Sequence, residues 1–319
     1  MRAVVLPRFG EPEVLEIRDV PRPQPGPGEV VVRVVASGTN PVEAKIRATG
    51  TWANLTLPAV IGYDAAGVVE ELGAGVTELS VGDEVYYTPE VFGNPHGTHA
   101  EYNVVAASIV AKKPASLGFV EAAGVPLAGG TAYEAIVRRL GVRLGDTVLI
   151  HGGAGGVGSF AVQIAKAAGA RVLATAGSTN QALLHELGAE VPIDYTKQDP
   201  AEVALAETGG RGVDAVFDAV GGGLVASSIR AVRPFGQLAT ILPPSGDLGA
   251  LYLRNQTLHG VFLTRERARL ESLTKLIEAG HVRPIIAQVE PLDGVFEAHR
   301  RLDAGHGRGK IILRVSDAD

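Results

Sequence analysis

The stretch HGGAGGVG, residues 151–158, could bind the phosphates of a dinucleotide. Gly153, Gly155 and Gly158 form the pattern G-x-G-x-x-G, whose glycines permit a tight turn, close approach of the backbone to a pyrophosphate, and close packing of helix on strand. The strand-like DTVLIHG precedes the loop and the helix-like SFAVQIAKAAGA follows it, which is the context that the motif needs. We therefore predict a dinucleotide site at the helix start. The alternative is a purely structural glycine turn.

The residues after the next strand indicate which dinucleotide binds. Folds that prefer NAD place an Asp or Glu about 20 residues beyond the loop to hold the ribose 2′-hydroxyl. This chain has no acidic residue between Gly158 and Glu186, and its strand RVLATA runs into GSTN. Gly177, Ser178 and Thr179 could donate hydrogen bonds to a 2′-phosphate, so we expect NADPH rather than NADH. In the alternative, Ser178 and Thr179 only cap the next helix.

The segment HGTHAEY contains His96, His99 and Glu101, which are residue types that bind metal ions. The chain has no cysteine, which excludes disulfides and thiolate zinc sites, and no further ligand supports these three residues. We expect no metal site, and histidines that line or cap a loop.

Two kinds of pattern along the chain must position these residues. Residues 1 to about 120 form short β-rich runs broken by Gly and Pro, such as EVVVRVVASG, which are typical of a mostly antiparallel β-domain. After Pro126, strands and helices alternate, which predicts a parallel sheet covered on both faces. A helix from about 266 and a last strand, KIILRV, return to the first part. We predict an α/β domain, residues 123–265, inserted in a β-rich domain, residues 1–122 plus 266–319.

Composition excludes several classes of function. The 319 residues suggest about two domains, and no apolar run reaches the roughly 18 residues that a membrane span needs. A net charge of −6 without a basic block argues against a nucleic-acid partner. The start MRAVVLPRFG lacks the pattern of a secretion signal, so we expect a cytoplasmic protein.

Several stretches together resemble the zinc-independent, zeta-crystallin-like quinone oxidoreductase branch of the medium-chain dehydrogenase/reductase superfamily. They are residues 26–50, 57–86, 97–102, 126–136, 146–172, 212–222 and 307–313, which begin with GPGEVVVRVVASGTNPVEAKIRATG and end with GRGKIIL. The resemblance implies a Rossmann doubly wound sheet inserted in a GroES-like catalytic domain. It also implies homodimers, NADPH as the donor, and a small-molecule substrate, a quinone or an α,β-unsaturated carbonyl, as the acceptor.

The resemblance also implies roles for single residues. Asn40 would lie near the nicotinamide and the substrate, and Thr131 near the carboxamide. Other expected cofactor contacts are Gly156, Val157 and Gly158 at the pyrophosphate, Gly177, Ser178 and Tyr195 at the 2′-phosphate, Lys310 on the phosphate side, and Val220 and Leu242 beside the ribose and nicotinamide. Tyr195 could instead be an ordinary strand-end aromatic, and Lys310 a solvated charge.

Three departures from the family pattern bear on the chemistry. Thr39, Asn40 and Pro41 stand where the zinc-dependent branch has a cysteine. Asn180 and Gln181 stand where NADPH-specific relatives commonly have a lysine, so discrimination between the two cofactors is expected to be modest. Trp52 replaces a tyrosine of related enoyl reductases and cannot supply a hydroxyl proton, which counts against an enoyl-thioester substrate.

Hydride transfer to a quinone or enone places negative charge on the acceptor oxygen, which needs hydrogen-bond donors or a cation. We expect the Asn40 amide and Lys45 to serve, with solvent supplying the proton; Lys45 could equally be a surface lysine. Trp52, Tyr63 and Phe262 are expected as apolar walls for a flat acceptor, with domain packing as the alternative for each.

The sequence is also compatible with two other functions. One is a reductase of enoyl thioesters or of 2-alkenals, which would need a cleft that admits the longer substrate. The other is a non-catalytic NADPH-binding redox sensor or structural dimer, which steady turnover would exclude. The resemblance further predicts dimerisation through the strand around LHGVFL, residues 258–263.

Overall fold

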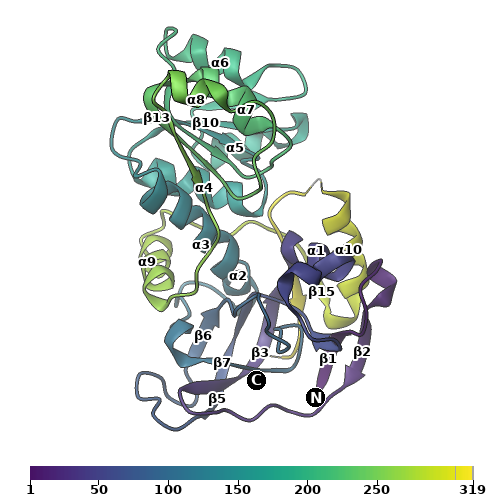
Figure 1. Ribbon diagram of the computed structural model, residues 1–319. Coiled ribbons are helices and arrows are strands. Elements are labelled where there is room, and N and C mark those ends of the chain that lie inside the picture. Colours follow the sequence, from purple (N-terminus) through teal and green to yellow (C-terminus); the bar gives the residue numbers. More distant parts are fainter. Residues whose placement is uncertain (306, 318–319) are drawn as a thin grey trace. The chain divides into compact units, whose positions relative to one another are not determined.

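The structure, a computed structural model, describes residues 1–305 and 307–317 (Figure 1). It divides into two compact units, one of Met1–Leu127, Thr264–Ala279 and Pro284–Asp319, the other of Ala128–Leu263 and Gly280–Arg283. The sequence suggested changes of domain after residues 122 and 265; the units change after Leu127 and Leu263, and the short segment Gly280–Arg283 joins the second unit. Residues 306, 318 and 319, which fall in the expected first domain, lie outside the described residues.

The first unit is built on two sheets whose strand pairs are mostly antiparallel. A seven-stranded sheet has the order β15-β16-β3-β5-β6-β8, with β7 also paired to β3, and a three-stranded sheet has the order β2-β1-β4. Strands β15 and β16 pair in parallel. The strands are β1 (Arg2–Leu6), β2 (Glu16–Asp19), β3 (Glu29–Gly38), β4 (Ala59–Val60), β5 (Ala65–Leu72), β6 (Glu84–Tyr87), β7 (Tyr102–Ala106), β8 (Ala111–Lys112), β15 (Ile286–Pro291) and β16 (Lys310–Arg314).

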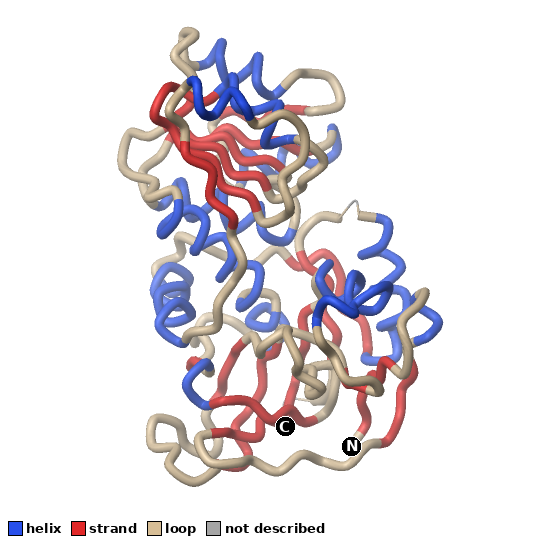
Figure 2. The backbone as a smooth tube through the Cα atoms, viewed as in Figure 1, coloured by secondary structure: helices blue, strands red, loops and turns tan. Residues whose placement is uncertain are grey.

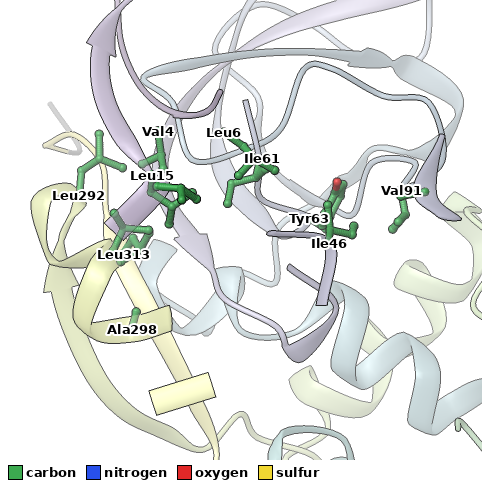
Figure 3. Close-up of a cluster of buried hydrophobic side chains, with 13 residues drawn as sticks. Val4, Leu6, Leu15, Ile46, Ile61, Tyr63, Val91, Leu292, Ala298 and Leu313 are labelled. Atoms are coloured by element: carbon green, nitrogen blue, oxygen red, sulfur yellow. The ribbon is translucent and has the colours of Figure 1, made fainter. Parts of the chain in front are cut away.

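Helices α1 (Pro41–Thr49), α2 (Phe119–Ala123), α9 (Arg267–Glu278) and α10 (Val295–Ala304) complete this unit. One core cluster joins distant parts of the chain, with Leu6 from β1, Ile46 from α1, Ala298 from α10 and Leu313 from β16 all buried (Figure 3). Burial of such apolar side chains is the main favourable contribution to folding. Helix α10 and strand β16, near the C-terminus, are therefore part of the β-rich unit.

The second unit is a Rossmann fold. Its six strands are parallel, in the order β11-β10-β9-β12-β13-β14, and helices lie on both faces of the sheet (Figure 2). The strands are β9 (Thr147–His151), β10 (Arg171–Ala176), β11 (Val191–Asp194), β12 (Val213–Asp218), β13 (Val232–Thr240) and β14 (Thr257–Gly260). The helices are α3 (Pro126–Tyr133), α4 (Gly156–Ala167), α5 (Gln181–Glu186), α6 (Pro200–Glu207), α7 (Leu224–Ser228) and α8 (Gly249–Leu253).

Two helices of this unit change character at their ends. Helix α3 is followed by a π-helical segment, Glu134–Arg139. Helix α7 is followed by a 3-10 turn, and β13 begins at Val232. Among the described residues, no helix is long and apolar enough to cross a membrane.

Candidate active site

The carboxyl edge of the parallel sheet collects most of the expected cofactor residues. Chain order reverses between β9 and β12, which makes this the topological switch point where open α/β sheets bind ligands. All five residues of β9 are buried, and the glycine loop begins directly after its last residue, His151. Thr175 of β10 fixes the loop by accepting hydrogen bonds from Gly152 N at its Oγ1 (3.1 Å) and from Gly153 N at its carbonyl (2.9 Å).

The glycines of this loop do two different things. A Cβ on Gly158 would lie 2.1 Å from the carbonyl oxygen of Gly152, so only glycine allows this packing of α4 on the loop. A Cβ on Gly155 would meet only that same oxygen, at 3.3 Å, so the backbone there is open. No side chain caps α4, whose first turn, Gly156 to Gly158, has N–H groups without intrahelical acceptors. This cradle of N–H groups fits a dinucleotide pyrophosphate.

Two further loops lie beside the glycine loop. Asp218, the last residue of β12, accepts hydrogen bonds from Val220 N and Gly221 N at 2.9 Å each. A Cβ on Gly152 would lie 2.6 Å from Val220 Cγ2, and one on Gly221 would lie 2.8 Å from Leu242 Cδ1. These contacts bring Val220 and Leu242 to the switch point. Val220 is exposed, which leaves its side chain accessible.

A buried polar pair supports this edge and was not expected from the sequence. His151 Nε2 lies 2.8 Å from Ser228 Oγ, and both residues are buried. Burial lowers the pKa of His151 to about 4, against the opposing effect of Asp218. His151 is therefore neutral at pH 7 and serves as a hydrogen-bonding partner of Ser228.

At the ends of β10 and β11, the structure places exposed Ser178 and Tyr195 on neighbouring loops. The alternative role of Ser178 and Thr179 as helix caps is not realised, because Asn180 is the N-cap of α5 and no side chain accepts a capping hydrogen bond. Ser178 Oγ instead donates to Asp194 Oδ2 at 2.5 Å. Asp194, the last residue of β11, was not among the expected site residues.

In the first unit, Asn40 is the centre of a buried polar network. It is the N-cap of α1, and its N–H donates to Glu43 Oε2 at 3.1 Å. Its side-chain Nδ2 donates to Asp64 Oδ2 (3.0 Å) and to Glu43 Oε1 (3.3 Å), while its Oδ1 accepts from Lys310 Nζ (2.5 Å). Both amide hydrogens are therefore used within the unit. The expectation that Asn40 itself donates to an acceptor oxygen does not agree with this geometry.

Lys310 belongs to the same network. Its ammonium donates to Thr39 O (2.8 Å), Asn40 Oδ1 and Asp64 Oδ2 (3.1 Å), and the residue is only 4% exposed. An ammonium has three donors, so none is left for a cofactor phosphate. Neither the expected phosphate contact nor the alternative of a solvated charge describes this lysine. Burial raises the pKa of Asp64, and the Lys310 cation opposes that effect.

Glu43, His99 and His299 form a second buried cluster, with possible ligand atoms within 4.8 Å of one another. His99 Nε2 lies 3.2 Å from Glu43 Oε2, and its Nδ1 lies 2.8 Å from Ser37 Oγ. Burial raises the pKa of Glu43, but the larger combined effect of His99 and other neighbours lowers it. Burial also lowers the pKa of His299 to about 4. The structure thus groups His99 with these residues and not with His96, which is exposed.

The other expected site residues differ in their exposure and in their neighbours. Lys45 is exposed on α1 and, among the described residues, makes no hydrogen bond or ion pair with the Asn40 network. Trp52 is 45% exposed and packs edge to face on Phe92, with ring centroids 6.0 Å apart. Tyr63 is fully buried in the core cluster of Figure 3, where it packs and does not form an open wall. Phe262, after β14, is 56% exposed, and Thr131 on α3 is buried.

The side chains of Asn40 and Asp64 do not fit a catalytic zinc ion. Where the zinc-dependent branch has its cysteine, this chain has Asn40, whose side-chain oxygen binds the ammonium of Lys310. The same ammonium neutralises Asp64, the neighbouring buried carboxylate. A protein cation therefore occupies the centre of this group of oxygen atoms.

Comparisons with known proteins agree with this architecture. The chain matches the family models "Alcohol dehydrogenase GroES-like domain" over residues 26–115 and "Zinc-binding dehydrogenase" over residues 187–313. A quinone oxidoreductase of Pseudomonas aeruginosa is 35% identical, over 96% of this chain and 97% of that protein. The chloroplastic NADPH-dependent alkenal/one oxidoreductase of Arabidopsis thaliana is 32% identical, over 98% of this chain and 79% of that protein.

A solved structure described as an NAD-dependent alcohol dehydrogenase superposes with a TM-score of 0.92 at 35% identity, and the match covers 99% of this chain and all of that one. Sequence, fold and the glycine loop therefore agree. The chain is an oxidoreductase that belongs to the quinone oxidoreductase branch of the medium-chain dehydrogenase/reductase superfamily.

Proposed function

We propose that the protein transfers hydride from NADPH to quinones or α,β-unsaturated carbonyls without a metal ion. The observation that carries this proposal is the buried Lys310–Asn40–Asp64 group, which takes the place of a metal-binding donor set. Conjugated acceptors spread the developing charge and need less electrophilic help than simple ketones, so positioning can supply more of the rate. Relatives named for quinones and for alkenals and enones support these acceptor classes.

Bound NADPH would supply the hydride; the chain's own residues bind and orient. The N–H groups of Gly156 to Gly158 would hold the pyrophosphate, and Val220 and Leu242 would flank the ribose and nicotinamide. Trp52, exposed in the first unit, would supply an apolar surface for a flat acceptor. Asn40 donates both amide hydrogens within the buried network. We therefore assign it the role of holding the side chains of that network in place, without contact to the acceptor. Solvent would deliver the final proton.

The absence of an acidic residue on β10 and the exposure of Tyr195 beside it support NADPH as a donor. The test is a fluorescence titration of the purified chain with NADPH and with NADH, followed by a 1,4-quinone and by a 2-alkenone while the reduced-nicotinamide absorbance is followed. We expect turnover with both acceptors. Tight binding without oxidation of either cofactor would instead favour a sensor.

A 2-alkenal reductase is the second candidate, because one relative is named for alkenals. The ratio of kcat/KM for a 2-alkenal to that for a 1,4-quinone separates the two. An enoyl-thioester substrate has less support, since Trp52 stands where a hydroxyl donor would be needed.

We also propose a cytoplasmic homodimer. β14 is the last strand of the six-stranded sheet and pairs with β13 along one side only, so its other edge could pair with the β14 of a second copy. Sedimentation at micromolar concentration should give the mass of two chains. A monomer would contradict the proposal.

A further inference from the structure

The carboxyl edge of the Rossmann sheet carries an acidic residue on β11, the strand beside β10. In dinucleotide folds that prefer NAD, the second strand ends in an acidic residue that binds the 2′-hydroxyl. Here that strand, β10, ends in Ala176 without one. The parallel register pairs Ala176 with Asp194, the last residue of β11. The neighbouring strand therefore brings a carboxylate to the same edge of the sheet.

Asp194 lies among the residues expected around the adenosine ribose. Its Oδ2 accepts the Ser178 hydroxyl at 2.5 Å, and its Oδ1 accepts Thr196 Oγ1 at 2.6 Å and Thr196 N at 3.1 Å. A Cβ on Gly177 would lie 3.9 Å from the hydroxyl of Tyr195, so that side chain borders the same place. The Ser178 hydroxyl donates its one proton to the Asp194 carboxylate, so it has no further proton to donate to a phosphate.

The negative charge of Asp194 is balanced by the ammonium of Lys197. The Ser178 and Thr196 hydrogen bonds hold the pKa of Asp194 well below its usual range, so the carboxylate is ionised at pH 7. Lys197 Nζ lies 3.0 Å from Asp194 Oδ2, and its side chain is 69% exposed. A phosphate ester carries a charge of about −1.5 to −2 at neutral pH. It would be repelled by Asp194 and attracted by Lys197, whereas a ribose hydroxyl can donate a hydrogen bond to Asp194.

We propose that Asp194 and Lys197 are the residues that set the choice between NADPH and NADH. The carboxylate disfavours the 2′-phosphate and accepts the 2′-hydroxyl, and the lysine offsets the repulsion. The chain accordingly uses both cofactors, with affinities within roughly tenfold of each other, a difference of about 1.4 kcal/mol. This inference rests on the proposed binding of the dinucleotide at the glycine loop.

Calorimetric titration of the full chain with NADP⁺ and with NAD⁺ tests the inference without any acceptor. Asp194→Asn removes the charge while keeping the shape, and should raise the ratio of NADP⁺ to NAD⁺ affinity at least tenfold. Lys197→Ala should lower that ratio by a similar factor. Glu190→Gln is the matched control, because it removes a carboxylate at the opposite end of β11 that pairs with Lys166, and it should leave the ratio within twofold.

The opposite signs of the two effects distinguish charge from structural damage, which would weaken both cofactors alike. Ratios unchanged within twofold in both folded variants would overturn the inference, and so would a wild-type preference above a hundredfold. Binding of neither cofactor to the wild-type chain would overturn the inference together with the proposed function. Binding with the predicted ratios but no turnover of any acceptor would support the inference and reject the proposed reaction alone.

Discussion

Replacing Lys310 by methionine should strongly destabilise the β-rich unit. The ammonium is the cation beside Asp64, whose side chain is fully buried, at 3.1 Å. Methionine preserves most of the side-chain volume but leaves the carboxylate buried without its charge partner. Removing one member of a buried ion pair typically costs about 3–5 kcal/mol. At about 2–4 °C per kcal/mol for chains of this size class, the unfolding midpoint should fall by roughly 6–20 °C.

Urea and thermal unfolding followed by circular dichroism at pH 7 measure this effect. The double variant Asp64→Asn/Lys310→Met removes both charges, so it should recover part of the lost free energy of unfolding. Lys45→Met changes an exposed lysine of the same unit and should cost less than about 0.5 kcal/mol. If the free energy of unfolding of Lys310→Met lies within about 1 kcal/mol of the wild-type value, then Lys310 is not the buried charge partner of Asp64 that the structure shows.

Three further predictions address protonation, the glycine loop and the acceptor surface. The pKa of His299 is about 4 in the folded chain and about 6.5 in the unfolded chain, so protonation favours the unfolded chain. The free energy of unfolding should therefore fall between pH 6.5 and pH 4 by up to about 3 kcal/mol. His299→Gln should flatten this part of the pH profile, and an unchanged slope would show that His299 is not the group responsible. Gly155→Ala should weaken cofactor binding at least tenfold with little change in the unfolding midpoint. Gly158→Ala should lower both the cofactor affinity and the unfolding midpoint, because its Cβ would lie 2.1 Å from the carbonyl oxygen of Gly152. Equal unfolding midpoints for the two variants would contradict the packing role of Gly158. Trp52→Ala should raise the KM of a quinone severalfold and leave that of NADPH unchanged, and a change confined to the NADPH value would refute an acceptor role.

The glycine loop could be predicted from the sequence because its signals are local. The glycine spacing and the change from strand to helix lie within a few residues of one another, and the structure joins β9 to α4 through this loop. The strand order that brings Val220 and Leu242 to the same edge was implied by family resemblance and follows from the parallel register of β9, β12 and β13.

The polar network of the first unit could not be predicted in this way. Lys310 and Asn40 are 270 positions apart in the chain, and no local pattern reports their pairing. One local signal was present: Asn40, Pro41 and Glu43 have the spacing of an N-terminal helix cap, which places the Glu43 carboxylate beside Asn40. Asp194 does not follow from the NAD pattern, because that pattern places its acidic residue at the end of β10, whereas this carboxylate comes from the strand beside it.

Direct transfer of hydride from NADPH to the acceptor is the central claim. We would incubate the purified chain with a 2-alkenone and NADPH carrying deuterium at C4, prepared separately in each of its two stereoisomeric forms, and determine the mass of the reduced ketone. The account predicts one deuterium in the product from one of the two forms and none from the other. A product without deuterium from either form, or no reduction with either, would contradict it.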